Sequence, residues 1–123
     1  MIRSFLIVGL GSFLGGGVRF LLTRAVSHYV SHPFPAGTFV VNMLGCLAMG
    51  AICACFERGH VMHPDVRLFL TVGVCGGFTT FSTFMNENLQ LLKGEQMLWL
   101  ALYAACSLLL GLLAVWCGYA LVR

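Results

Sequence analysis

The sequence predicts an all-α membrane protein with four transmembrane helices, the third of which is broken. Of the 123 residues, 59% are hydrophobic and only 9% are charged, whereas soluble domains average about 25% charged residues. The mean hydropathy is +0.94. Because the hydrocarbon core of a bilayer takes about 20 helical residues, each apolar stretch of that length is a candidate span. Four such stretches occur, and short connectors separate them.

We expect the spans at about residues 3–22, 37–56, 66–92 and 96–121, within a single four-helix transmembrane domain that covers residues 1–123. The connectors carry most of the polar residues, including His28, His32, His60 and His63. The first span shares some features with a secretory signal. Its length, its glycines, the interruption by Arg19 and the three spans that follow favour a membrane helix.

The distribution of positive charge leaves the orientation open. If the N-terminus marks side A, four arginines lie on that side and three basic residues lie on or near side B: Arg3, Arg58, Arg67 and Arg123 against Arg19, Arg24 and Lys93. The positive-inside rule requires a clear bias, and four against three is a weak one. Either the chain has a slight orientation preference or it inserts both ways, which would allow an antiparallel homodimer.

The first span combines close-packing residues with a charge. Gly11-Ser12-Phe13-Leu14-Gly15 has two small residues four apart, a pattern that lets helix backbones approach closely. Arg19 follows, and an arginine at membrane depth is costly unless it finds carbonyl or acidic partners. We favour a structural tie to a helix end, and the alternative is a vestibule that attracts an anion.

The second span places polar residues on one face. Thr38, Asn42, Gly45 and Met49 are spaced so that they share one side of a helix. The Asn42 amide must find a hydrogen-bond partner inside the membrane. It either donates to a permeating anion or holds another helix.

The third span contains the most unusual stretch, residues 73–84. Gly76-Gly77 weakens the helix by about 1 kcal/mol per glycine relative to alanine, and Thr79 or Thr80 can cap a helix that restarts. Backbone groups freed in a bilayer persist only where protein, ion or water satisfies them. We therefore predict a broken helix that lines a site.

Aromatic residues follow this break at regular spacing. Phe78, Phe81 and Phe84 lie three apart and are predicted to share a helix face. The rim of an aromatic ring is electropositive and can face an anion. Without a fixed positive charge, such a site binds an ion weakly enough to release it, as conduction requires.

Neutral polar groups complete the predicted ion path. Ser82 and Thr83 stand beside the phenylalanines, and Asn42 supplies an amide. Tyr103, which shares a face of the fourth span with Ser107, offers another hydroxyl, although a core or interfacial tyrosine is the simpler interpretation. These residues predict an ion pathway without identifying the ion.

Other functional classes fit less well. The chain has no serine–histidine–acid set within one element, no HExxH and no phosphate-binding loop, so we expect no enzyme. The sequence contains no basic patch that would predict a nucleic-acid partner. A proton-coupled small-molecule exporter of the four-helix small multidrug type usually needs an acid or histidine at membrane depth, and only Glu87 comes near. A third alternative is a non-transporting assembly subunit that uses the Gly11 and Gly15 face.

Three segments in order resemble the CrcB/Fluc fluoride channels: Gly15-Gly16-Gly17-Val18-Arg19-Phe20, Gly37-Thr38-Phe39-Val40-Val41-Asn42-Met43-Leu44-Gly45 and Gly73-Val74-Cys75-Gly76-Gly77-Phe78-Thr79-Thr80-Phe81-Ser82-Thr83-Phe84. The resemblance covers essentially the whole chain. It implies a dual-topology homodimer in the bacterial inner membrane, whose two antiparallel pores export fluoride passively and so lower cytoplasmic fluoride toxicity.

The resemblance also assigns roles to individual residues. Phe81 and Phe84 would form an aromatic fluoride box, and Asn42 would line the same path. Ser82 and Thr83 would correspond to a hydroxyl track. The backbone carbonyls of Gly76 and Thr79 would hold a structural Na⁺ at the dimer interface, and Arg19 would lie near a vestibule.

Overall fold

The computed structural model describes residues 1–29, 34–58 and 63–122, and all regular structure within these ranges is helical. Three spans are continuous helices, and the third consists of several pieces. The elements are α1 (Ile2–Tyr29), α2 (Ala36–Glu57), α3 (Pro64–Leu68), the π-helix η1 (Phe69–Cys75), α4 (Gly76–Phe78), α5 (Ser82–Lys93) and α6 (Met97–Val122).

Four helical stretches are long and apolar enough to cross a bilayer: Ile2–Tyr29, Ala36–Glu57, Pro64–Lys93 and Met97–Val122. They confirm the predicted all-α chain with four membrane-spanning segments. α1 runs to Tyr29, beyond the span end expected near Leu22, because neither glycine nor proline interrupts its last turns. Two of the connector histidines, His32 and His60, lie outside the described residues.

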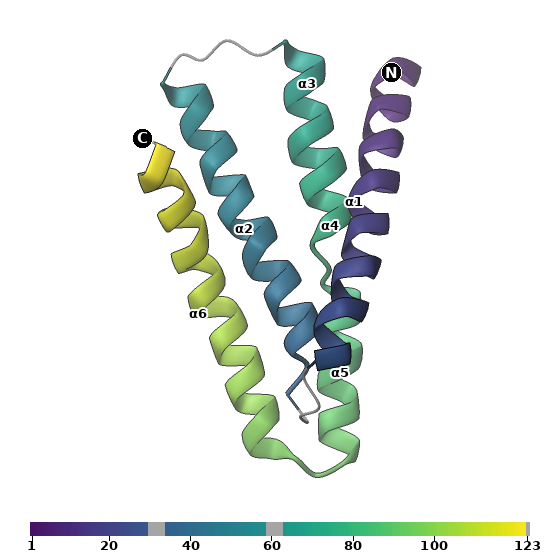
Figure 1. Ribbon diagram of the computed structural model, residues 1–123, viewed down its shortest axis with the longest axis vertical. Helices are drawn as coiled ribbons and strands as arrows, with labels where there is room; N and C mark the ends of the chain where they lie inside the picture. Colours follow the sequence, from purple (N-terminus) through teal and green to yellow (C-terminus); the bar gives the residue numbers. More distant parts are fainter. Residues whose placement is uncertain (30–33, 59–62, 123) are drawn as a thin grey trace.

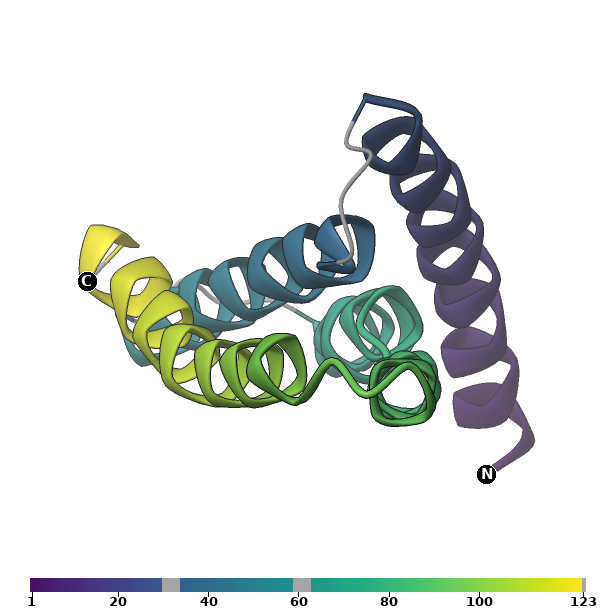
Figure 2. The ribbon, with the colours of Figure 1, turned by 90° about the horizontal axis from the view of Figure 1, so that it is seen from below.

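The helices form two pairs that diverge toward the end of the molecule carrying both termini (Figure 1). α2 packs along α6, and α1 packs along η1 and α4, the first half of the third span. Figure 2 shows the same pairing from below, with α5 beside the start of α6. The two pairs are therefore joined mainly at the end opposite the termini.

Glycines allow α2 and α6 to touch backbone to backbone. A Cβ added at Gly50 would lie 1.9 Å from the carbonyl oxygen of Val115, and one at Gly118 would lie 2.0 Å from that of Leu47. Van der Waals contact between backbones is a main source of helix association in lipid, where burial of apolar surface gives no driving force. Any larger residue at either glycine would separate this pair.

The small residues of α1 serve the other pair in the same way. A Cβ at Gly11 would lie 2.8 Å from Gly73 Cα, and one at Gly15 would lie 2.3 Å from the Val74 carbonyl oxygen. The Gly11–Gly15 motif is therefore occupied by the chain's own third span.

Arginines connect neighbouring helices at the end that carries the termini. Arg3 and Asp65 form an ion pair of 2.5 Å between α1 and α3. The Arg67 guanidinium lies 4.4 Å from the centre of the Phe56 ring on α2. Three contacts thus link the four spans in series, namely Arg3–Asp65, Arg67–Phe56 and, at 2.7 Å, Arg58 Nη1 donating to the Val122 carbonyl.

Candidate functional site

The third span loses its helical conformation between α4 and α5. Thr79 is extended, with φ −79° and ψ 156°, directly after α4 ends at Phe78. Phe81 stands at the N-cap position of α5, and its side chain makes no capping hydrogen bond. The Thr80 hydroxyl nevertheless accepts a 3.3 Å bond from the Thr83 N–H, and this supplies a partner near the start of α5.

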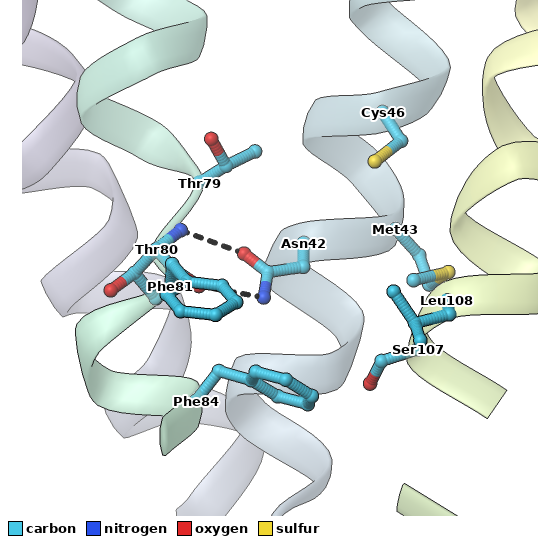
Figure 3. Close-up of a pocket in the computed structure, with 9 residues that line it drawn as sticks. All are labelled: Asn42, Met43, Cys46, Thr79, Thr80, Phe81, Phe84, Ser107 and Leu108. Atoms are coloured by element: carbon cyan, nitrogen blue, oxygen red, sulfur yellow. Dashed lines mark hydrogen bonds between the residues drawn. The ribbon is translucent and has the colours of Figure 1, made fainter. Parts of the chain in front are cut away.

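Asn42 on α2 holds the extended segment in place. Its Oδ1 accepts a 2.9 Å hydrogen bond from the Thr80 N–H, and its Nδ2 donates a 3.0 Å bond to the Thr80 carbonyl (Figure 3). The amide thereby pairs with one residue's backbone as a neighbouring strand would. A carboxamide offers two N–H donors, and no described residue accepts a hydrogen bond from the second N–H of Asn42.

These paired bonds also release carbonyl oxygens. In a continuing helix the Thr80 N–H would pair with the Gly76 carbonyl, but here it pairs with Asn42. Likewise, the Thr83 N–H that would pair with the Thr79 carbonyl pairs with the Thr80 hydroxyl. The carbonyls of Gly76 and Thr79 are thus left without their regular helical donors.

A pocket of about 270 Å³ lies against this segment, between α2, α5 and α6 (Figure 3). It contains an amide, three hydroxyls, two aromatic rings and a thiol. Its lining residues are Asn42, Met43, Cys46, Thr79, Thr80, Phe81, Phe84, Ser107 and Leu108. The pocket therefore combines neutral donors with apolar walls.

Two of the three predicted phenylalanines meet in this pocket. The ring centres of Phe81 and Phe84 are 5.9 Å apart at an angle of 48°. Phe81 is 70% exposed in the single chain, whereas Phe84 is buried. The prediction that Phe78 shares their helix face is wrong, because the extended Thr79 interrupts the helix. Phe78 lines a separate, apolar pocket between α1, α2 and α4.

The hydroxyls of the pocket differ from those singled out in the sequence. Ser82 is exposed and Thr83 is half-buried, and neither lines the pocket. Thr79, Thr80 and Ser107 line it instead. The Ser107 Oγ is buried without a hydrogen-bond partner in the described part of the chain. A buried hydroxyl without a partner is a group available to a ligand.

A second polar cluster adjoins Phe84. The Glu87 carboxylate accepts a 2.8 Å bond from the Thr38 hydroxyl and a 2.7 Å bond from the Tyr103 hydroxyl. Tyr103 is fully buried, and its ring centre lies 4.9 Å from that of Phe84. Sequence reasoning placed Tyr103 near the path but did not join these three residues. The sequence signal that could have revealed this cluster is Glu87, an ionisable residue inside a span, which needs polar partners there.

Arg19 lies apart from both clusters. It is half-buried on α1, and its Nε is buried without a partner in the described residues. The structure shows no helix end or carboxylate bonded to it, so the expected structural tie is not seen within the described part of the single chain.

The arrangement can offer N–H and O–H groups to a small anion beside aromatic rings. Asn42 has a spare N–H, and Ser107 has an unpaired hydroxyl. Among the described residues, no group of three or more histidine, cysteine, aspartate or glutamate side chains could hold a metal ion. The released backbone carbonyls are the available ligands for a hard cation.

Comparison with known proteins identifies relatives over nearly the whole chain. The family model described as "CrcB-like protein, Camphor Resistance (CrcB)" matches residues 6–119. A protein of Flavobacterium psychrophilum named fluoride-specific ion channel FluC is 40% identical over 98% of this chain and 98% of its own length. Proteins of the same name from Phocaeicola vulgatus and Bacteroides fragilis are 45% and 48% identical, over 94% and 86% of this chain and 95% and 88% of their own lengths. The chain belongs to the CrcB-like family.

Proposed function

We propose that this protein is a fluoride-selective channel that lets fluoride leave the bacterial cytoplasm passively across the inner membrane. The observation that carries the proposal is the pocket at the interrupted third span, where the Asn42 amide, the Ser107 hydroxyl and the Phe81 and Phe84 rings converge. Relatives that share 40–48% of their residues with this chain are named fluoride-specific ion channels. Export of fluoride down its gradient lowers its toxicity in the cell.

The geometry suits a small, strongly hydrated anion. Fluoride must exchange its water shell for hydrogen-bond donors, and the spare N–H of Asn42 and the O–H of Ser107 provide two. The electropositive rims of Phe81 and Phe84 add an attraction without a full charge. Since none of the described residues that line the pocket is a fixed cation, the ion is held weakly enough to move on.

The Glu87 cluster continues the path beyond Phe84. Both hydroxyls that bind the carboxylate can rotate about their C–O bonds and donate to a passing anion instead. In this role Thr38 and Tyr103 compensate for the repulsion between fluoride and Glu87. Ser82 and Thr83, which are more exposed, extend the hydroxyl track in the assembled channel, and Arg19 attracts anions to a vestibule.

The released carbonyls of Gly76 and Thr79 fit a structural Na⁺, because neutral backbone oxygens at unwound membrane helices are typical ligands for this ion. When bound, the ion neutralises the partial negative charge of these oxygens and rigidifies the interruption. Two carbonyls are too few to enclose a cation, so we assign the remaining ligands to a second, antiparallel copy.

This antiparallel homodimer agrees with the weak charge bias. An N-terminal tag should be cleaved by external protease in about half of the molecules in sealed vesicles, as equal insertion in both orientations requires. Complete cleavage or complete protection would exclude dual topology.

The function is tested by efflux from liposomes that contain the purified protein. We expect rapid, protein-dependent release of fluoride, detected with a fluoride electrode, while chloride stays inside because the larger ion accepts weaker hydrogen bonds from these donors and needs a wider space between the rings. Equal chloride release would disprove selectivity, and no fluoride release would disprove the channel.

The proton-coupled exporter is the alternative that the half-buried Glu87 makes worth testing. It predicts that transport requires a pH gradient and stops in Glu87→Gln. Passive fluoride efflux without a pH gradient, retained in Glu87→Gln, excludes it.

A further inference from the structure

A third pocket opens at the end of the molecule opposite the two termini. It has a volume of about 260 Å³ and is lined by Pro35, Glu87, Gln90, Leu91, Gly94 and Gln96. These residues come from the N-cap position just before α2, from α5 and from the α5–α6 turn, which lie together at that end (Figure 1). We call this pocket the glutamine pocket.

Glu87 connects the glutamine pocket to the pocket at Asn42. Its carboxylate lies between the hydroxyls of Thr38 and Tyr103, which are 2% and 0% exposed. The Tyr103 ring contacts Phe84, and Phe84 lines the Asn42 pocket. A continuous series of contacts therefore leads from the glutamine pocket through the Glu87 cluster to the aromatic rings.

The two glutamines present unengaged donors at this opening. Backbone bonds close the turn by themselves, with the Gly94 N–H on the Gln90 carbonyl at 3.0 Å and the Gln96 N–H on the Leu91 carbonyl at 2.9 Å. Neither glutamine side chain bonds to any described residue. Both side chains are exposed, and each carboxamide has two N–H donors.

The charges at this end explain why neutral donors matter there. Lys93 and Glu95 are exposed on the same turn, but neither lines the pocket. Among the described residues that line the pocket, Glu87 is the only one with a charge-bearing side chain, and its carboxylate repels an anion. An anion that enters here meets the carboxamides of Gln90 and Gln96 before it meets that carboxylate.

We propose that the glutamine pocket is the mouth through which the anion path reaches water at this end, and that Gln90 and Gln96 are its first anion-contacting side chains. This inference rests on the proposed channel function and extends it to a specific opening. It predicts that a charge placed in the mouth changes conduction according to its sign, because a mouth lies in series with the rest of the path.

Charge substitutions test the mouth in reconstituted liposomes. At about 0.01 M salt, we expect Gln90→Glu and Gln96→Glu to slow fluoride efflux by about threefold, and Gln90→Lys and Gln96→Lys to raise it by a similar factor. At about 1 M salt, where the Debye length falls from about 30 Å to about 3 Å, all four should approach the wild-type rate. Leu92→Glu and Leu92→Lys are the matched controls, since Leu92 is exposed on α5 at the same end but does not line the pocket. Because a charge there lies beside the mouth and not in it, its effect at low salt should be clearly smaller than at the two glutamines.

The outcomes separate the mouth from the channel itself. Opposite, salt-sensitive effects at Gln90 and Gln96, with clearly smaller effects at Leu92, support the mouth, because misfolding cannot accelerate efflux. The proposed mouth is overturned if the wild-type protein releases fluoride but the glutamine variants behave like the Leu92 controls. It is also overturned if the glutamine variants lose activity whatever the sign of the charge and the salt concentration. Absence of fluoride efflux from the wild-type protein contradicts the proposed function instead.

Discussion

At the scale of single residues, Asn42 joins α2 to the extended backbone of the third span through two hydrogen bonds to Thr80. The sequence left two roles open for this residue, an anion donor and a tie between helices. The structure shows the tie, and the geometry also leaves one N–H for an ion. One carboxamide can serve both purposes because it has two donors and an acceptor.

Replacement of Asn42 tests its structural role and its role in efflux together. Asn42→Ala leaves the Thr80 N–H and C=O without their partner, and each unpaired buried group costs about 1–3 kcal/mol. We expect a lower thermal midpoint in detergent together with loss of fluoride efflux. Asn42→Asp keeps the acceptor for the Thr80 N–H but sets a carboxylate oxygen against the Thr80 carbonyl in place of the amide N–H, so it should also be destabilised and lose efflux. An alanine variant with unchanged thermal stability would contradict the structural role.

Residue-scale prediction from the sequence succeeded where the type of side chain was decisive. An asparagine within a span predicts a hydrogen-bond partner, and Asn42 has one. The identity of that partner, a backbone group 38 positions away, depends on the tertiary fold. The same limit applies to Glu87, whose contact with Thr38 crosses 49 positions.

At the scale of elements, the third span differs from the others because its backbone changes conformation four times. The π-helix η1 precedes α4, and the Gly76 N–H reaches back to the Thr71 carbonyl in the wide π pattern. The Thr71 hydroxyl donates to the Arg67 carbonyl at 2.7 Å, a local bond that competes with regular helix pairing. π-helical turns occur frequently at functional sites.

The glycine contacts predict which helix pairs tolerate added bulk. Gly50→Ala places a methyl group against the Val115 carbonyl, and such overpacking typically costs about 1–3 kcal/mol. We expect a clear fall in the thermal midpoint of the purified protein. Gly9→Ala is the matched control, because nothing lies within 4 Å of its added Cβ. Its stability should stay the same or rise by up to about 1 kcal/mol from helix propensity. Equal stability of the two variants would show that α2 and α6 are not in backbone contact.

The elements were only partly predictable. Hydropathy and length located four spans, since each residue contributes to both independently of the fold. The phenylalanine spacing failed for Phe78 because a period of three has meaning only while the helix continues, and Thr79 is extended. The pairing of Gly11 with Gly73 was also hidden, because a small-residue motif does not specify its partner.

At the scale of the whole molecule, the described helices form two close pairs, α1 with the first half of the third span and α2 with α6 (Figure 1). The Asn42 pocket lies between α2, α5 and α6, and the Glu87 cluster adjoins it. The proposed route follows these sites toward the glutamine pocket. Exposed apolar side chains cover much of α1 and α6, as expected for surfaces that face lipid or a second copy.

The central claim is that fluoride passes the aromatic pair beside Asn42, and the most direct measurement is fluoride efflux from liposomes that contain Phe81→Ile, Phe84→Ile or the control Phe78→Ile. We expect each pocket ring to contribute about 0.5–1.5 kcal/mol, the size of a contact between two aromatic rings, so its loss should slow efflux by up to about tenfold. Phe78→Ile removes a ring from the separate apolar pocket and should retain most of the efflux. Well-folded Phe81→Ile and Phe84→Ile proteins that release fluoride at the wild-type rate would contradict the account.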